Sequence, residues 1–187
     1  MRILMRVAGV LFAGILVTPV IGAQPSASSP KPPDSPSTFL LDRWNDIGRK
    51  LTAMAEDMPE DKYDFKPNPA QRSFAEQLLH AAGANYFFIY PAKGLEPPKA
   101  GPKRADYKTK AAVVDFVKKS FADGAVLIQS KGDSGLGDVF IDPFSKNQTR
   151  FSDFAWDFIE HSGEHYGQLV VYYRVAGLVP PESRPKK

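Results

Sequence analysis

Four stretches of the sequence repeat apolar residues at the three- and four-residue spacing of an amphipathic helix. This pattern limits the fold more than any other feature of the chain. The first stretch, for example, places Leu40, Trp44 and Ile47 on one stripe. Four helices of this length pack best around a shared core, so the sequence predicts an all-α four-helix bundle. The expected helices cover residues 38–58, 73–90, 109–130 and 149–176.

Two long connections interrupt the helical pattern, at residues 91–108 and 131–148. The first contains four prolines, which do not continue a helix. The second includes the apolar segment 138–141, for which we expect a short strand. A shorter loop, residues 59–72, is broken by three prolines. The bundle is therefore expected to carry two long inter-helix loops.

Local signals mark two helix ends. Ser73 and Glu76 have the spacing of a capping box, in which each side chain accepts a hydrogen bond from a backbone amide of the first turn. Gly177 stands where a left-handed residue ends a helix, and the prolines at 180 and 181 prevent continuation. The second helix is therefore expected to begin at residue 73, and the fourth to end near residue 176.

The N-terminal residues have the pattern of a secretory signal peptide. Two arginines precede an apolar run, and a small-residue cleavage pattern ends at Ala23. The apolar run is shorter than the roughly 20 residues that span a bilayer, although an uncleaved anchor remains the alternative. We expect an exported protein, periplasmic or extracellular, with a signal peptide at 1–23. A disordered Pro/Ser-rich tether at 24–37 and a helical domain at 38–184 would follow.

Charge and cysteine content exclude several kinds of function. Removal of residues 1–23 takes away two arginines and leaves 22 basic against 21 acidic side chains, without a basic cluster. The mature chain therefore lacks the footprint of a nucleic-acid-binding protein, and no stable membrane span remains. The sequence has no cysteine, which rules out disulfides, thiolate metal sites and a cysteine nucleophile. Any metal site must use imidazole, carboxylate and water.

Two of the three histidines in the chain, His161 and His165, lie four positions apart in the fourth predicted helix. Residues at this spacing share one helix face, so both imidazoles can bind one ion. Asp157 and Gln168 extend the same polar stripe by one turn in each direction. A pair of solvated histidines without function is the alternative for this spacing alone.

The third histidine, His80, lies among apolar residues in the second predicted helix. It is about 10 Å from the start of that helix, and His165 is about 16 Å from the end of the fourth. If the two helices run antiparallel, the three histidines meet within about one turn. Three imidazoles with open positions form a complete shell for zinc or nickel. The sequence therefore predicts a divalent metal site on His80, His161 and His165.

The segment from His161 to His165 also spells H-x-x-E-H, a metalloprotease signature in which the glutamate acts as general base. That class of protease needs a further acidic ligand well downstream. Only Glu182, in a proline-rich tail, is available after His165. On a helix, Glu164 falls about 60° from His161 and about 100° from His165, so we expect it to flank the site. For both reasons we do not favour a protease.

The sequence resembles the DinB-like (DinB/YfiT-type) family of bacterial four-helix-bundle proteins, and in particular its exported members. The resemblance rests on KYDFKPNPAQRSFAEQLLHAAGANYFF and, much later, FIEHSGEHYGQLVVYYRVAGLVPPES. The shared pattern is one early histidine, an H-x-x-x-H pair, a Gly-Gln and a Tyr-Arg-x-x-Gly-x-x-Pro ending. These correspond here to His80, His161, His165, Gly167, Gln168, Tyr173, Arg174, Gly177 and Pro180.

This resemblance covers about residues 38–184 and implies an up-down-down-up bundle with a three-histidine divalent metal site. It also implies a possible homodimer. Some cytosolic relatives are metal-dependent transferases or isomerases that use low-molecular-weight thiols, but an exported protein would lie outside the compartment where such thiols are abundant.

Two functions follow from these observations. The first is a metal-dependent hydrolase or transferase of unknown small-molecule substrate. In it, Asp157, Glu160 or Glu164 would act as general base or orient an imidazole. Tyr86, Tyr90 and Tyr172 would line its pocket. The alternative is a non-catalytic, metal-stabilised helical binding or scaffold protein, and metal sequestration is a weaker third possibility.

Overall fold

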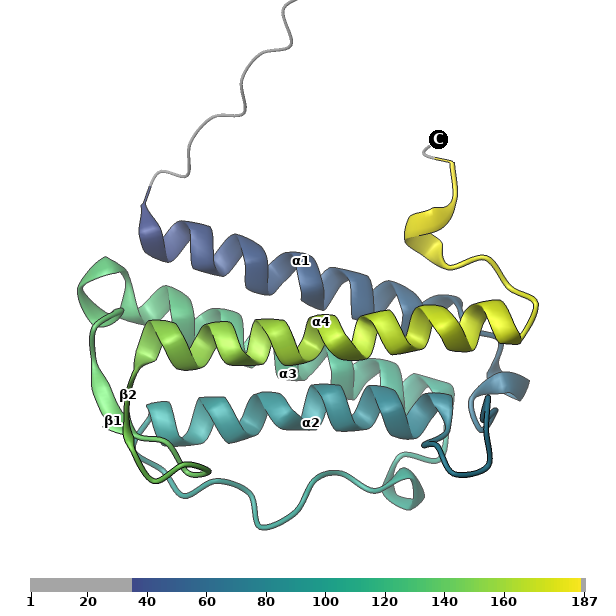
Figure 1. Ribbon diagram of the computed structural model, residues 1–187, viewed down its shortest axis with the longest axis horizontal. Helices are drawn as coiled ribbons and strands as arrows, with labels where there is room; N and C mark the ends of the chain where they lie inside the picture. The colour runs from purple at the N-terminus through teal and green to yellow at the C-terminus, as the bar shows by residue number, and fades with distance from the viewer. Residues whose placement is uncertain (1–34, 186–187) are drawn as a thin grey trace, which may run out of the picture. The chain divides into compact units, whose positions relative to one another are not determined.

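The computed structural model describes residues 35–185, which form four α-helices and one small hairpin (Figure 1). The predicted signal peptide and nearly all of the predicted tether lie outside these residues. The all-α four-helix bundle is confirmed. The helices are α1 (Pro36–Asp57), α2 (Phe74–Ala92), α3 (Lys110–Lys131) and α4 (Phe151–Val175), and the strands are β1 (Val139–Ile141) and β2 (Gln148–Arg150). Single 3₁₀ turns cover Glu60–Lys62, Arg104–Asp106, Asp133–Gly135 and Pro181–Ser183.

The helices follow the expected up-down-down-up order. Figure 1 shows α1 and α4 running in one direction, and α2 and α3 in the other. Hydrogen bonds between helix ends agree: Tyr173 near the end of α4 donates to the Met54 carbonyl near the end of α1. Because α2 and α3 are consecutive and parallel, residues 93–109 must return along the whole bundle, which explains the long proline-rich connection (Figure 1).

Several helix ends differ from the predicted ones. Helix α1 begins at Pro36, two residues before the predicted start, and therefore includes the last two residues of the predicted tether. Ser35 caps the helix, and a proline is favourable at the first helical position. Helix α2 continues through Pro91 to Ala92, because a proline so near the end removes only one hydrogen bond. The capping box of Ser73 and Glu76 is present as predicted.

The fourth helix begins later than predicted because the residues before it pair in a hairpin. Strand β2 (Gln148–Arg150) is antiparallel to β1 (Val139–Ile141), the short strand expected near residues 138–141. The backbone amide of Phe151, the first residue of α4, then donates to the Asp138 carbonyl. At the other end of α4, Gly177 adopts a φ of +77°, the left-handed conformation that its position predicts.

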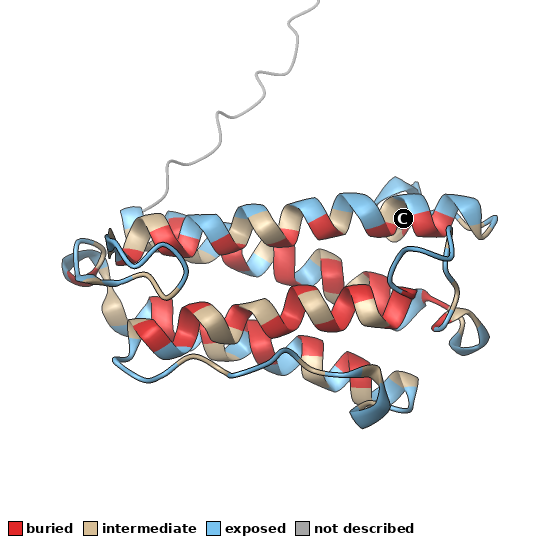
Figure 2. Ribbon diagram, turned by 60° about the horizontal axis from the view of Figure 1, so that its bottom comes forward, coloured by how far each residue is buried: buried red, intermediate tan, exposed pale blue. Residues whose placement is uncertain are grey.

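The core lies between the four helices, where the buried faces meet (Figure 2). Of the predicted stripe on α1, Leu40, Trp44 and Ile47 are buried, as are the residues that continue it towards Met58. Trp44 is fully buried, and its indole Nε1 donates to the Phe121 carbonyl of α3 at 2.8 Å. Within residues 35–185, no helix combines the length and hydropathy needed to span a membrane.

The Gly124→Ala substitution is expected to lower the free energy of unfolding by about 1–2 kcal/mol. A Cβ atom at Gly124 would lie 2.0 Å from Cζ2 of Trp44. The indole cannot retreat without losing its hydrogen bond to Phe121. This strain exceeds the gain of about 1 kcal/mol that alanine usually brings to a helix. Urea unfolding of both proteins measures the difference.

Gly167→Ala is the matched control, since a Cβ at Gly167 in α4 meets nothing within 4 Å. That substitution should raise the stability by up to about 1 kcal/mol. Equal effects at the two positions would contradict close packing of α3 on Trp44.

Candidate metal centre

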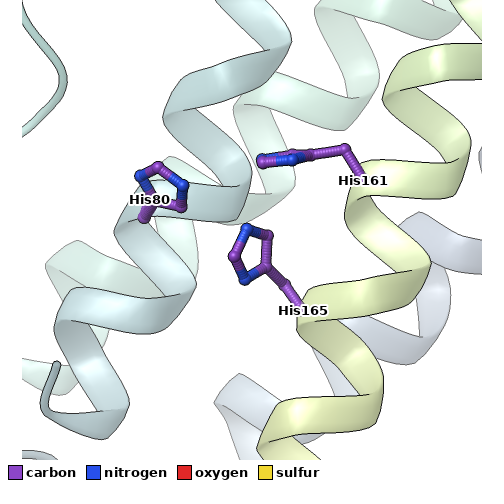
Figure 3. A group of neighbouring side chains, drawn as sticks. All are labelled: His80, His161 and His165. Carbon is purple, nitrogen blue, oxygen red and sulfur yellow. The ribbon is translucent and has the colours of Figure 1, made fainter. Parts of the chain in front are cut away.

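The structure brings all three histidines together between α2 and α4 (Figure 3). His80 comes from the middle of α2, and His161 and His165 come from successive turns of α4. One ring nitrogen from each imidazole lies within 4.8 Å of the others. The ring centroid of His165 is 4.8 Å from that of His80 and 4.4 Å from that of His161. Figure 3 shows the three rings pointing toward one another rather than along the helices.

The antiparallel pairing of α2 and α4 sets the levels of the histidines, as the sequence predicts. The Tyr172 hydroxyl, near the end of α4, donates to the Arg72 carbonyl just before α2 at 2.7 Å. This contact holds the end of one helix beside the start of the other. The distance along α2 from this contact to His80 is similar to the distance along α4 from the contact to His165. The rings of His80 and His165 are therefore in contact.

Burial favours the uncharged form of all three imidazoles. Burial, followed by the nearby rings of His161 and His80, lowers the pKa of His165 to about 4. Burial is also the main cause that lowers the pKa of His80 and that of His161. Neutral imidazole is the form that binds metal ions, so the site needs no proton release at physiological pH.

The donor set fits a divalent transition metal. Nε2 of His161 is buried and has no hydrogen-bond partner among the described residues. A buried polar nitrogen without a partner is costly, and an ion held between the rings would satisfy it. Imidazole nitrogens are common ligands of such ions, in agreement with the divalent metal ion predicted from the sequence.

A glutamine supports the ring of His165 from behind. Gln77, one turn before His80 on α2, is 2 % exposed, and its Nε2 lies 2.5 Å from Nδ1 of His165. Gln77 also donates to the side-chain oxygen of Gln168 on α4. Because Nδ1 is engaged by Gln77, Nε2 of His165 is the nitrogen available to an ion. A side chain at this place can orient the ring of a metal-binding histidine.

The centre opens onto a cavity of about 970 Å³, with His80 and His161 in its wall. This volume is in the range of small-molecule binding sites. One part of the wall is aromatic and another part is basic. The aromatic side chains are Phe87, Phe144, Phe154 and Phe158, and the basic ones are Lys66, Arg72, Lys103 and Arg104. A bound ion would therefore keep a face that small molecules can reach.

Comparison with known families identifies the fold. The sequence profile of the DinB superfamily matches residues 44–169, which include all three histidines. The chain belongs to the DinB superfamily. A search of curated protein sequences found no match.

Solved structures of DinB-like proteins share this fold. A DinB-like protein from Bacillus cereus superposes with a TM-score of 0.63 at 20% identity, covering 76% of this chain and 93% of that chain. A DinB-like protein from Bacillus subtilis gives a TM-score of 0.63 at 18% identity, over 79% and 99% of the two chains. YfiT from Bacillus subtilis gives 0.60 at 13% identity, over 84% and 96%. YfiT has been described as a probable metal-dependent hydrolase with an unusual four-helix bundle topology.

The carboxylates predicted near the centre of this DinB superfamily member lie in different places. Asp157 is exposed but lines the cavity, and partial burial, with the nearby charges of Glu160 and Asp142, raises its pKa. Glu160 and Glu164 are also exposed to solvent, and neither lines the cavity. Glu182, the acid considered as a protease ligand, instead binds Arg49 of α1 at 2.6 Å. Of these carboxylates, Asp157 is the one placed to meet a small molecule in the cavity.

The three tyrosines predicted to line the pocket lie in different places. Tyr172 lines a second, smaller cavity that shares Arg72 with the first. Tyr86 instead packs against α3, where its hydroxyl donates to Asp123 at 2.9 Å, and its ring lies against Tyr90. Gln77 is a site residue that was not predicted, although its spacing of three residues before His80 places it on the same helix face.

Proposed function

We propose that this DinB superfamily protein is a divalent-metal-dependent hydrolase of a small molecule, with zinc or nickel held by His80, His161 and His165. The observation that carries the proposal is the convergence of three imidazoles, two of which line a large cavity. Three protein ligands with open positions are typical of catalytic zinc sites, whereas structural sites are closed by a fourth. The description of YfiT supports the same reaction class. The signal-peptide pattern of residues 1–23 supports the proposal that the protein acts after export.

The bound ion and the residues around it would have separate roles in the proposed reaction. When bound, a divalent ion supplies a Lewis acid and a water molecule of lowered pKa. Gln77 holds the ring of His165 in place. The carboxylate of Asp157, one turn before His161, accepts a proton from the attacking water. The aromatic wall excludes bulk water from the substrate.

Metal content and metal-dependent activity test this proposal. Elemental analysis of the purified protein should find about one zinc or nickel per chain. The loaded protein should hydrolyse at least one member of a panel of chromogenic carboxylic and phosphate esters and amides. Chelation should abolish this activity, and added metal should restore it. Asp157→Asn should then lower kcat by roughly a hundredfold or more while metal content stays unchanged.

The alternative of a non-catalytic bundle makes a different prediction. In that case the open coordination positions would be closed, and small ligands would not reach the ion. The test uses cobalt-substituted protein. If added imidazole does not change its absorption spectrum and it hydrolyses nothing in the panel, the hydrolase proposal is contradicted and the scaffold function is favoured.

A further inference from the structure

Arg72 is a basic residue beside the metal centre. It lines the cavity together with His80 and His161, and it lines the second, smaller cavity together with Gln77, which contacts His165. Its backbone is held in place, because it directly precedes the N-cap of α2 and its carbonyl accepts the hydrogen bond from Tyr172, and its side chain is exposed. Within residues 35–185, its guanidinium has neither an ion pair nor a hydrogen bond.

A bound ion and Arg72 together would place more positive charge beside the cavity than its wall balances. The three imidazoles are neutral ligands, so an ion bound by them keeps its full charge, and Arg72 adds another beside it. The cavity wall also holds three carboxylates. One of them, Glu76, is balanced by Lys66, whose ammonium lies 3.7 Å away. The other two, Asp142 and Asp157, do not fully balance a divalent ion together with Arg72, so the site favours an anionic ligand.

A second cation, Lys103, reaches the cavity from the long connection between α2 and α3. Like Arg72, it has no ion pair in the part of the chain that the structure describes, whereas the neighbouring Arg104 is bound by Asp64 at 2.8 Å. Close packing brings this segment to the cavity. A Cβ atom at Gly83 of α2 would lie 2.4 Å from Cδ of Pro102, so only glycine lets the connection approach this closely.

Another part of the cavity wall is apolar. Phe158 lies against His161, with ring centroids 6.3 Å apart, and so borders the metal centre directly. Phe87 of α2 and Phe144 of the hairpin stack with centroids 5.8 Å apart. Phe144 is 62% exposed, so this stack forms an accessible edge of the cavity. An aromatic wall of this size binds an apolar group, because burial of its surface is favourable.

We propose that the substrate is a small organic anion, with a carboxylate or phosphate bound by Arg72 and Lys103 and an apolar group bound by the phenylalanine wall. The anionic group would lie beside the metal centre, where it balances the charge of the ion and of Arg72. The reaction of such a substrate rests on the function proposed above, but the binding preference does not, because both binding walls belong to the chain itself.

Binding of matched probes tests this inference. The probes are 4-phenylbutyrate, its neutral amide 4-phenylbutanamide, butyrate without the ring, and phenyl phosphate. Calorimetry with both zinc-loaded and metal-free protein separates binding to the chain from direct binding to zinc. We expect 4-phenylbutyrate to bind more tightly than its amide or butyrate in both forms. Comparison with phenyl phosphate decides which anionic group the site prefers.

Arg72→Gln should weaken 4-phenylbutyrate roughly tenfold to a hundredfold, because a hydrogen bond to a charged group is lost, and should leave the amide unchanged. Lys103→Gln should have a smaller effect in the same direction. Arg43→Gln is the control, since Arg43 lies over the ring of Phe39 on α1 and is not part of the cavity wall. Equal melting temperatures for the metal-free variants would show that the fold is intact.

Two results would overturn the inference. One is equal affinity of the parent protein for 4-phenylbutyrate and its amide, and the other is an affinity of the Arg72→Gln protein for 4-phenylbutyrate within twofold of the parent value. The outcome is separable from the proposed hydrolase. If the protein binds anions through Arg72 but shows no metal-dependent activity, the proposed ligand class is supported and the proposed hydrolase function is contradicted. If the protein hydrolyses neutral esters in preference to anionic ones, the hydrolase function is supported and the ligand class is contradicted.

Discussion

The His161→Ala protein is expected to lose the stabilisation that zinc gives the parent protein, while its metal-free stability changes little. An ion that binds only the folded chain stabilises it by about 2.7 kcal/mol at a concentration one hundred times its Kd. For a domain of this size, that corresponds to a rise in melting temperature of about 5–10 °C. Removal of one of three ligands takes away most of the affinity and therefore the rise. Thermal unfolding with and without zinc or nickel, together with elemental analysis, measures both effects.

Two further variants make this prediction specific. His80→Ala removes a ligand from the opposite helix and must have the same effect as His161→Ala. Unchanged metal content in that variant would disprove the three-ligand site. Glu160→Gln is the control, because it changes an exposed side chain directly beside His161 and should keep both the metal and the temperature shift.

The fold and the histidine cluster could be predicted because they depend on local and periodic features. The apolar stripe on α1 and the capping box at Ser73 are each contained in one short segment. The meeting of His80 with His165 needed only helix geometry and an antiparallel pairing. The resemblance to DinB-like proteins, carried by the two histidine-containing segments, supplied the order of the helices.

Features that depend on packing between distant segments could not be predicted in the same way. The support of His165 by Gln77 requires the register of α2 against α4 at the level of single side chains. The basic wall of the cavity requires the connection to pack on Gly83, and nothing local in the sequence places it there. Tyr86 was assigned to the pocket for a similar reason, since its spacing does not reveal that Asp123 of α3 binds its hydroxyl.

The same register explains why the site combines a protected side with an open one. His165 is 5 % exposed and is supported by Gln77, so it forms the rigid part of the centre. His80 and His161 are half-buried and face the cavity, so they form the part that a substrate approaches. A centre with one anchored and two accessible ligands can keep its geometry while small molecules enter and leave.

The Gln77→Leu substitution is therefore expected to weaken zinc binding by roughly tenfold to a hundredfold without unfolding the protein. In the structure, Gln77 presents its amide nitrogen to Nδ1 of His165, which suits an imidazole with its hydrogen on Nε2. Metal binding at Nε2 selects the other tautomer, whose Nδ1–H must donate to an oxygen. Rotation of the Gln77 carboxamide by half a turn exchanges its nitrogen and oxygen and supplies this acceptor. The carboxamide of Gln168 can rotate in the same way to keep its hydrogen bond to Gln77. Leucine has a similar volume but no acceptor, so the bound tautomer loses its partner.

Gln77→Glu separates this role from simple packing, because a carboxylate keeps the acceptor. We expect the glutamate variant to bind zinc within about tenfold of the parent protein at neutral pH, since carboxylate–histidine–metal contacts are common. Gln168→Leu should have a smaller effect than Gln77→Leu, because Gln168 is exposed whereas Gln77 is buried against the ring of His165. Competition with a chelating dye measures all four affinities, and metal-free melting curves check the fold. If Gln77→Leu binds zinc as tightly as the parent, the glutamine only fills space, and the orientation of His165 must come from the packing of α4 alone.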